Sequence, residues 1–142
     1  MADTLSWVLD TDVVVSGLLS PYGPPGRLLD MVVSRQLRVT LDDRIEDEYR
    51  HVLARPRFSI EPARREAFLA ILAFQDRVAC LPWAGKLTPD GDDVMFLEAA
   101  GASVSKTLVT GNLRHFPPAC RGHTSVVAPR QAWSLFVERL GR

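Results

Sequence analysis

Cysteine and histidine are scarce in this sequence of 142 residues, which contains two cysteines and three histidines. Cys80 and Cys120 do not have the spacing of a metal-binding pair, so we expect free thiols in a reducing, cytoplasmic compartment. The first ten residues, MADTLSWVLD, lack a basic region and a long apolar core, and no secretory signal is expected. The sequence therefore does not point to a disulfide-stabilised secreted domain or to a Cys/His zinc site.

Long apolar runs and an excess of one charge are also absent. No stretch reaches the roughly 18–20 apolar residues that a membrane span requires, so we expect no membrane association. The 17 basic and 17 acidic residues cancel, which excludes a uniformly basic surface for nucleic acid. Since Lys86 and Lys106 are the only lysines among those 17 basic residues, the other 15 are arginines. Arginine binds phosphate well in a bidentate manner, but a general compositional bias explains the same count.

Apolar segments with strand and helix periodicity alternate along the chain. The length and the 46% hydrophobic content predict one domain, residues 1–142, with its own core. Residues 12–20 fit either element, and 21–26 is a predicted loop. The predicted strands are 6–9, 37–41, 106–110 and 124–128, and the predicted helices are 27–36, 42–56, 61–78 and 129–140. This alternation predicts an α/β fold with a mainly parallel sheet.

Short polar residues follow two of the predicted strands. Asp10 and Asp12 come after the first strand, and Thr110, Gly111 and Asn112 come after the strand that begins near Lys106. Parallel α/β sheets place their sites at the carboxyl ends of strands. These positions are therefore site candidates, although the same residue types are common in ordinary turns, and Thr110 is equally suited to a local strand-end hydrogen bond.

Two further acids lie on predicted helices. Glu48 flanks an apolar stripe formed by Ile45, Tyr49, Val52 and Leu53, where an acid needs a cation or an arginine partner. In the segment TPDGDDVMFLEAA, residues 88–100, a helix that starts near Asp92 places Asp93 on the face of Phe96 and Leu97. The helical geometry does not exclude Asp92 as the core-facing acid. Asp90 and Asp92 also suit the start of the helix as capping acids.

Convergence of a strand-end Asp with these helical acids would create a metal site. Like charges raise each other's pKa unless a cation lies between them. Oxygen ligands without a Cys or His cluster suit Mg²⁺ or Mn²⁺. Such a site activates water and stabilises in-line displacement at a phosphodiester.

Five motifs in this order together resemble the PIN domain family, in the branch of toxin components of toxin–antitoxin systems. The motifs are VLDTDVVVSGLLS, IEDEYRHVLARPRF, DGDDVMFLEAA, LVTGNLRHFP and SVVAPRQAW. The resemblance implies a three-layer α/β/α sandwich and a metal-dependent ribonuclease similar to the VapC toxins. It also implies an RNA substrate and a small antitoxin protein as partners. A homodimer through apolar helix faces such as residues 68–74 is a further expectation.

The resemblance assigns roles position by position. Asp10, Glu48 and Asp93 match the three catalytic, metal-binding acids of the family, with Mg²⁺ or Mn²⁺ as the implied cofactor. Asn112 falls where many members carry a fourth acid, and we expect it to orient a water or a ligand. Asp12 stands where Asn is usual, so Asp12 and Asn112 are hypothesised to exchange a carboxylate across the site, with Thr110 as a second auxiliary residue.

Two readings of function follow. The first is an endoribonuclease that acts as the toxin of a type II toxin–antitoxin system. The alternative is a catalytically weakened PIN-like module that binds RNA or a partner protein, which Asn112 and the zero net charge favour slightly. Arg114 and His115 follow Asn112 and are candidates for RNA contact, although exposed residues of this kind are more often simply solvated.

Overall fold

A central parallel sheet organises the computed structural model, which describes residues 4–141. Its strand order is β3-β2-β1-β4-β5, and each neighbouring pair is parallel. The bounds are β1 Ser6–Leu9, β2 Arg38–Leu41, β3 Asp76–Arg77, β4 Thr107–Val109 and β5 Ser125–Val127. The chain leaves β1 toward β2 on one side and adds β4 on the other. The strand order therefore reverses between β1 and β4, where open α/β sheets form a crevice at their carboxyl ends.

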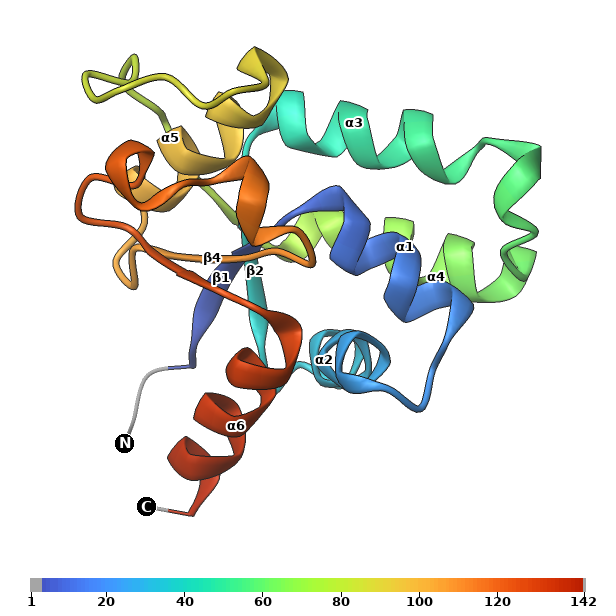
Figure 1. Cartoon of the computed structure of the whole chain (residues 1–142). Helices are drawn as coiled ribbons and strands as arrows, with labels where there is room; N and C mark the ends of the chain where they lie inside the picture. The colour runs from blue at the N-terminus through green and yellow to red at the C-terminus, as the bar shows by residue number, and fades with distance from the viewer. Residues whose placement is uncertain (1–3, 142) are drawn as a thin grey trace.

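Helices cover both faces of this sheet (Figure 1). Helix α5 packs on β1, β2 and β4, whereas α2 and α6 pack together on the opposite side. Helix α1 contacts both α2 and α3, and α4 contacts α2. The bounds are α1 Thr11–Leu19, α2 Pro24–Val33, α3 Asp43–Leu53, α4 Pro62–Ile71, α5 Val94–Ala102 and α6 Pro129–Leu140. The expected α/β/α sandwich is confirmed.

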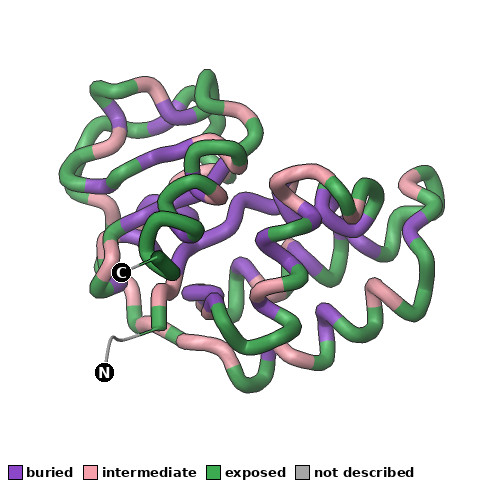
Figure 2. The backbone as a smooth tube through the Cα atoms, turned by 90° about the horizontal axis from the view of Figure 1, so that it is seen from below, coloured by how far each residue is buried: buried purple, intermediate pink, exposed green. Residues whose placement is uncertain are grey.

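The hydrophobic core surrounds the central strand. Val8 and Leu9 of β1 are fully buried, as are Leu108 and Val109 of β4. Figure 2 shows buried segments through the middle of the molecule and exposed ones on the outer turns of the helices. A strand buried on both faces requires the continuous apolar run seen at residues 6–9. Because the central strands are rigidly packed, the residues that follow them are held in place.

Several predicted elements have different limits in the structure. The predicted helix 61–78 is wrong at its end: α4 stops at Ile71, a short 3₁₀ turn covers Leu72–Phe74, and Asp76–Arg77 form the edge strand β3. The two-residue strand is too short for its periodicity to be recognised. The predicted loop 21–26 is also too long, because α2 begins at Pro24 with proline in its first turn. The ambiguous segment 12–20 is helical, as α1.

No helix within residues 4–141 is both long enough and apolar enough to cross a lipid bilayer. This agrees with the lack of long apolar runs in the sequence.

Candidate active site

The ends of β1 and β4 bring Asp10 and Thr110 together. Asp10 follows β1 directly, and its backbone N–H donates to the Val109 carbonyl at 2.8 Å. The Thr110 hydroxyl donates to Asp10 Oδ2, also at 2.8 Å. Both side chains are buried. Thr110, predicted as an auxiliary residue, therefore contacts the first predicted acid.

Asp12 lies in the first turn of α1 and faces the loop after β4. Its Oδ1 accepts a hydrogen bond of 3.1 Å from the Gly111 backbone N–H. A Cβ atom at Gly111 would lie 3.0 Å from Asp12 Oδ2, so the lack of a side chain there permits the close approach. Burial raises the pKa of Asp12, although the Gly111 N–H partly offsets this. Asp12 is therefore held beside the site and is not simply a solvated turn residue.

Asp93 stands immediately before α5, at the end of the 3₁₀ turn Gly91–Asp93. Its Oδ2 atom is buried and lacks a hydrogen-bond partner among the described residues. His115 Nδ1 lies 3.2 Å from this oxygen, which is an ion-pair distance without the angles of a hydrogen bond. The neighbouring Asp90 accepts the Asp92 backbone N–H at 3.0 Å. Asp90 is thus a capping residue, as predicted. The side chain of Asp93 makes no capping hydrogen bond to α5.

The aspartates of the site repel one another. The pKa of Asp10 is raised to about 7, mainly by burial; the charges of Asp12 and Asp93 add to this shift, and the Thr110 hydroxyl opposes it. The pKa of Asp93 is raised to about 6, mainly by burial. His115 opposes that shift, whereas Asp90, Asp12 and Asp92 add to it. The site therefore holds more negative charge than its local hydrogen bonds compensate, which is the usual condition of a functional site.

Glu48 approaches this group from α3. Its Oε2 accepts a hydrogen bond of 3.3 Å from the hydroxyl of Thr11, the residue after Asp10. Glu48 also lines a cleft of about 850 Å³ between α3 and α5. Asp92 lines the same cleft, but Asp93 does not. The glutamate therefore borders the site through Thr11.

Asn112 joins the site through its backbone. Its N–H donates to the Thr110 hydroxyl at 3.0 Å, and its carbonyl accepts the His115 N–H at 3.1 Å. Within residues 4–141, its side chain makes no hydrogen bond. The proposed exchange of a carboxylate between Asp12 and Asn112 stays a prediction.

His115 is a site residue that the sequence pattern undervalued. Its side chain is 47% exposed, as expected for a solvated residue, but its ring lies against Asp93. Its charge also lowers the pKa of Asp12. The signal that pointed to it was only its position three residues after Asn112. The 3₁₀ turn Leu113–His115 places the imidazole ring of His115 beside Asp93.

The described residues do not contain three acids placed to bind the same metal ion. Within residues 4–141, no group of three or more His, Cys, Asp or Glu side chains is close enough to hold one metal ion. Asp10, Asp12 and Asp93 interact electrostatically, while Glu48 is joined to them through Thr11. The prediction that Asp10, Glu48 and Asp93 bind one ion therefore stays a prediction.

Comparisons with known proteins bear on this geometry. A search of curated proteins found no match. The family model described as PIN domain matches residues 6–114, a range that contains Asp10, Glu48, Asp93 and Asn112. PIN domains are in general nucleases, and the parallel sheet with helices on both faces is consistent with that fold. The match spans well over half of the chain, which therefore belongs to the PIN domain family.

Proposed function

We propose that this protein is a metal-dependent endoribonuclease that hydrolyses phosphodiester bonds in RNA. The observation that carries the proposal is the buried Oδ2 of Asp93, which has no hydrogen-bond partner among the described residues. The charges of Asp12 and Asp93 also help to raise the pKa of Asp10. A buried charged oxygen without a partner is costly unless a cation compensates it. Nuclease chemistry is also the general activity of PIN domains.

The residues at the site fit a hard divalent cation. All candidate donors are carboxylate oxygens, which Mg²⁺ and Mn²⁺ prefer. We assign Asp10, Glu48 and Asp93 to hold it, directly or through water. Glu48 is included because it accepts a hydrogen bond from Thr11, the residue that follows Asp10. When bound, the cation would activate water and offset charge on the phosphate. The fit rests on the excess negative charge and on Asp93 Oδ2, which accepts no hydrogen bond from the described residues.

The remaining residues orient these ligands. The Thr110 hydroxyl holds Asp10 Oδ2, which fixes the direction of the other carboxylate oxygen. Asp12 is fixed by the Gly111 N–H and contributes charge. Asn112 contacts Thr110 through its backbone N–H, and its uncharged side chain is suited to orienting a water or a ligand but not to replacing a charge.

Cleavage of a labelled single-stranded RNA in the presence and absence of Mn²⁺ tests the proposal. We expect cleavage only with the metal, and loss of cleavage in Asp10→Asn, Glu48→Gln and Asp93→Asn. An Asp90→Asn variant is the matched control, because Asp90 is a capping residue of the same segment. Full Mn²⁺-dependent activity in Asp93→Asn would overturn the assignment.

We also propose that the nuclease acts as the toxin of a type II toxin–antitoxin system. The support is the resemblance of its five motifs to the toxin branch, and the partner would be an antitoxin that blocks the acidic site. Induced expression in a bacterial host should arrest growth, and Asp10→Asn should relieve the arrest at equal protein level. Growth unaffected by the wild-type protein, despite RNA cleavage in vitro, would contradict the toxin role.

The alternative function is a PIN-like binding module with weakened catalysis. The separation of the acids into an aspartate group and a neighbouring Glu48 favours it, because no three of them form one ligand set among the described residues. Manganese titration followed by calorimetry separates the two functions. RNA binding without Mn²⁺ binding or cleavage would identify the module.

A further inference from the structure

Arg44 links the start of α3 to the middle of α5. Its Nε and Nη2 atoms donate to Asp42 Oδ2 at 2.9 and 2.7 Å, and its Nη1 donates to Glu98 Oε1 at 2.8 Å. Asp42 precedes α3, and Glu98 belongs to α5. The guanidinium is half exposed, but both carboxylates are largely covered, with side chains 14% and 11% exposed. One planar cation thus bridges two separate elements, a geometry that suits arginine and not lysine.

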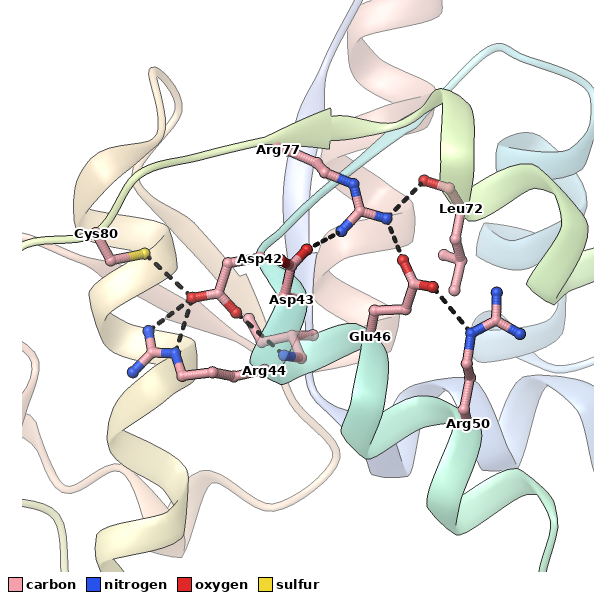
Figure 3. Close-up of polar contacts among 9 residues, drawn as sticks. Asp42, Asp43, Arg44, Glu46, Arg50, Leu72, Arg77 and Cys80 are labelled. Atoms are coloured by element: carbon pink, nitrogen blue, oxygen red, sulfur yellow. Dashed lines mark hydrogen bonds and ion pairs between the residues drawn. The ribbon is translucent and has the colours of Figure 1, made fainter.

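The two carboxylates are themselves fixed. Asp42 Oδ1 caps α3 by accepting the Ile45 backbone N–H at 3.1 Å. Glu98 Oε2 accepts the Trp83 backbone N–H at 2.8 Å, which secures the segment that precedes Asp93. The Cys80 thiol also contacts Asp42, as Figure 3 shows beside Arg44. Both carboxylates that Arg44 contacts are therefore held by further hydrogen bonds.

This bridge spans the cleft between α3 and α5. Arg44, Glu48 and His51 of α3 all line the cleft, at the three- and four-residue spacing of one helix face. Glu98, Met95 and Asp92 line it from the side of α5. The contact between Arg44 and Glu98 joins these two walls one helical turn from Glu48.

A second ion-pair cluster on α3 provides an internal comparison. Arg77 of β3 contacts Asp43 and Glu46, and Arg50 pairs with Glu46 at 2.9 Å. Figure 3 shows this cluster on the side of α3 that faces Leu72 and β3. Arg50 is 49% exposed, as Arg44 is, but it does not line the cleft. Arg44 pairs with Glu98 of α5 and with Asp42, whereas Arg50 pairs with Glu46 of its own helix.

We propose that Arg44 is a positioning residue that sets the separation of α3 and α5 and thereby places Glu48 opposite the segment of Asp93. The inference rests on the proposed nuclease function. Arg44 acts through Asp42 and Glu98 and not by contact with the cation. Loss of the bridge lets α3 shift relative to α5, which moves Glu48 away from the segment of Asp93 and weakens cation binding.

The experiment compares Arg44→Ala, Glu98→Gln and the control Arg50→Ala in the full chain. Mn²⁺ affinity is measured without RNA by electron paramagnetic resonance, and kcat and KM are measured separately. We expect Arg44→Ala and Glu98→Gln each to weaken Mn²⁺ binding by about tenfold, a typical effect of residues behind the metal ligands. A similar fall in kcat should accompany this, while Arg50→Ala stays at the wild-type values.

Direct contact of Arg44 with RNA predicts a different result. In that case Arg44→Ala would raise KM without changing Mn²⁺ affinity, and Glu98→Gln, which frees the guanidinium, would leave RNA binding intact. That pattern overturns the positioning role. Equal Mn²⁺ affinity in Arg44→Ala and Arg50→Ala overturns it as well.

Folding defects and failure of the proposed function give distinct signatures. Circular dichroism and thermal unfolding confirm that each variant is folded at the assay temperature. If Arg44→Ala does not fold, Glu98→Gln carries the test alone, since glutamine can still accept the Trp83 N–H. Absence of Mn²⁺ binding in the wild-type protein would overturn the proposed function and this inference together. If the wild-type protein binds Mn²⁺ and Glu98→Gln binds it with the same affinity, only the inference is overturned.

Discussion

The hydroxyl of Thr110 donates a hydrogen bond of 2.8 Å to Asp10 Oδ2, across 100 positions of sequence. The same hydroxyl oxygen accepts the backbone N–H of Asn112 at 3.0 Å. Thr110 is fully buried and Asp10 is nearly so. One side chain therefore joins the ends of β1 and β4 and orients the most strongly buried acid of the site.

Removal of this hydroxyl should damage both stability and metal binding. In Thr110→Val, Asp10 and the Asn112 N–H each lose a buried partner, and we expect a loss of about 1–3 kcal/mol in the free energy of unfolding. Mn²⁺ affinity should fall, because the Asp10 carboxylate is no longer oriented. Urea unfolding and Mn²⁺ titration measure the two effects. Thr107→Val is the matched control, because the Thr107 hydroxyl donates only to the nearby Ser105 carbonyl; weakened Mn²⁺ binding there would contradict the argument.

Stability without metal should fall as the pH rises from about 4 to 7. Asp10 has an ordinary pKa of 3.8 and a folded pKa of about 7, so in this window the folded state binds a proton that the unfolded state has released. Protonated Asp10 favours folding, and this advantage, of the order of 2–4 kcal/mol, is lost as the pH passes through the folded value. Asp42 and Glu46 have lowered pKa values, so their contribution changes only below their ordinary range.

Thermal unfolding between pH 5 and 8 measures this slope. Asp10→Asn should reduce the slope, with the remainder due to Asp93 and Asp12, whose pKa values are also raised. Saturating Mn²⁺ should offset the loss at pH 8, because a bound cation stabilises the folded state. A rising melting temperature over the same interval in metal-free protein would refute the electrostatic account.

Asp93→Asn should separate stability from function. At pH 8 the change removes a buried charged oxygen that lacks a hydrogen-bond partner, so the melting temperature of the metal-free protein should rise by a few degrees. The same variant should lose Mn²⁺-induced stabilisation and RNA cleavage. Differential scanning calorimetry with and without Mn²⁺ tests this. A metal-free protein that is less stable than wild type would show that Asp93 serves the fold and not a ligand.

The hypothesis of an exchanged carboxylate makes a reciprocal prediction. Asp12→Asn should reduce Mn²⁺ affinity and kcat by about tenfold, because it removes a charge that interacts with Asp10 and Asp93. Adding Asn112→Asp to that variant should restore part of both, since it returns a carboxylate to the same group. Metal titration and single-turnover cleavage of the three proteins check this. If Asp12→Asn leaves affinity and rate unchanged, the hypothesis is to be dropped.

Local sequence pattern determined the class of fold and the candidates for the site. The short, largely apolar segments 6–9 and 106–110 are typical of buried parallel strands, and polar residues at their ends mark the edge of the sheet at which sites form. The capping role of Asp90 was also local, because its partner is two residues away. Such features depend on neighbours along the chain, and residue type with spacing is enough to predict them.

Tertiary structure decided which candidates meet. Asp10 contacts Thr110 only because β1 and β4 are adjacent, although the strands are far apart in sequence. His115 reaches Asp93, Glu48 reaches Thr11, and Arg44 bridges to Glu98 for the same reason. The edge strand β3 is likewise specified by its pairing with β2 and not by its two residues. Long-range contacts depend on the order of strands and the packing of helices, which periodicity along one segment does not contain.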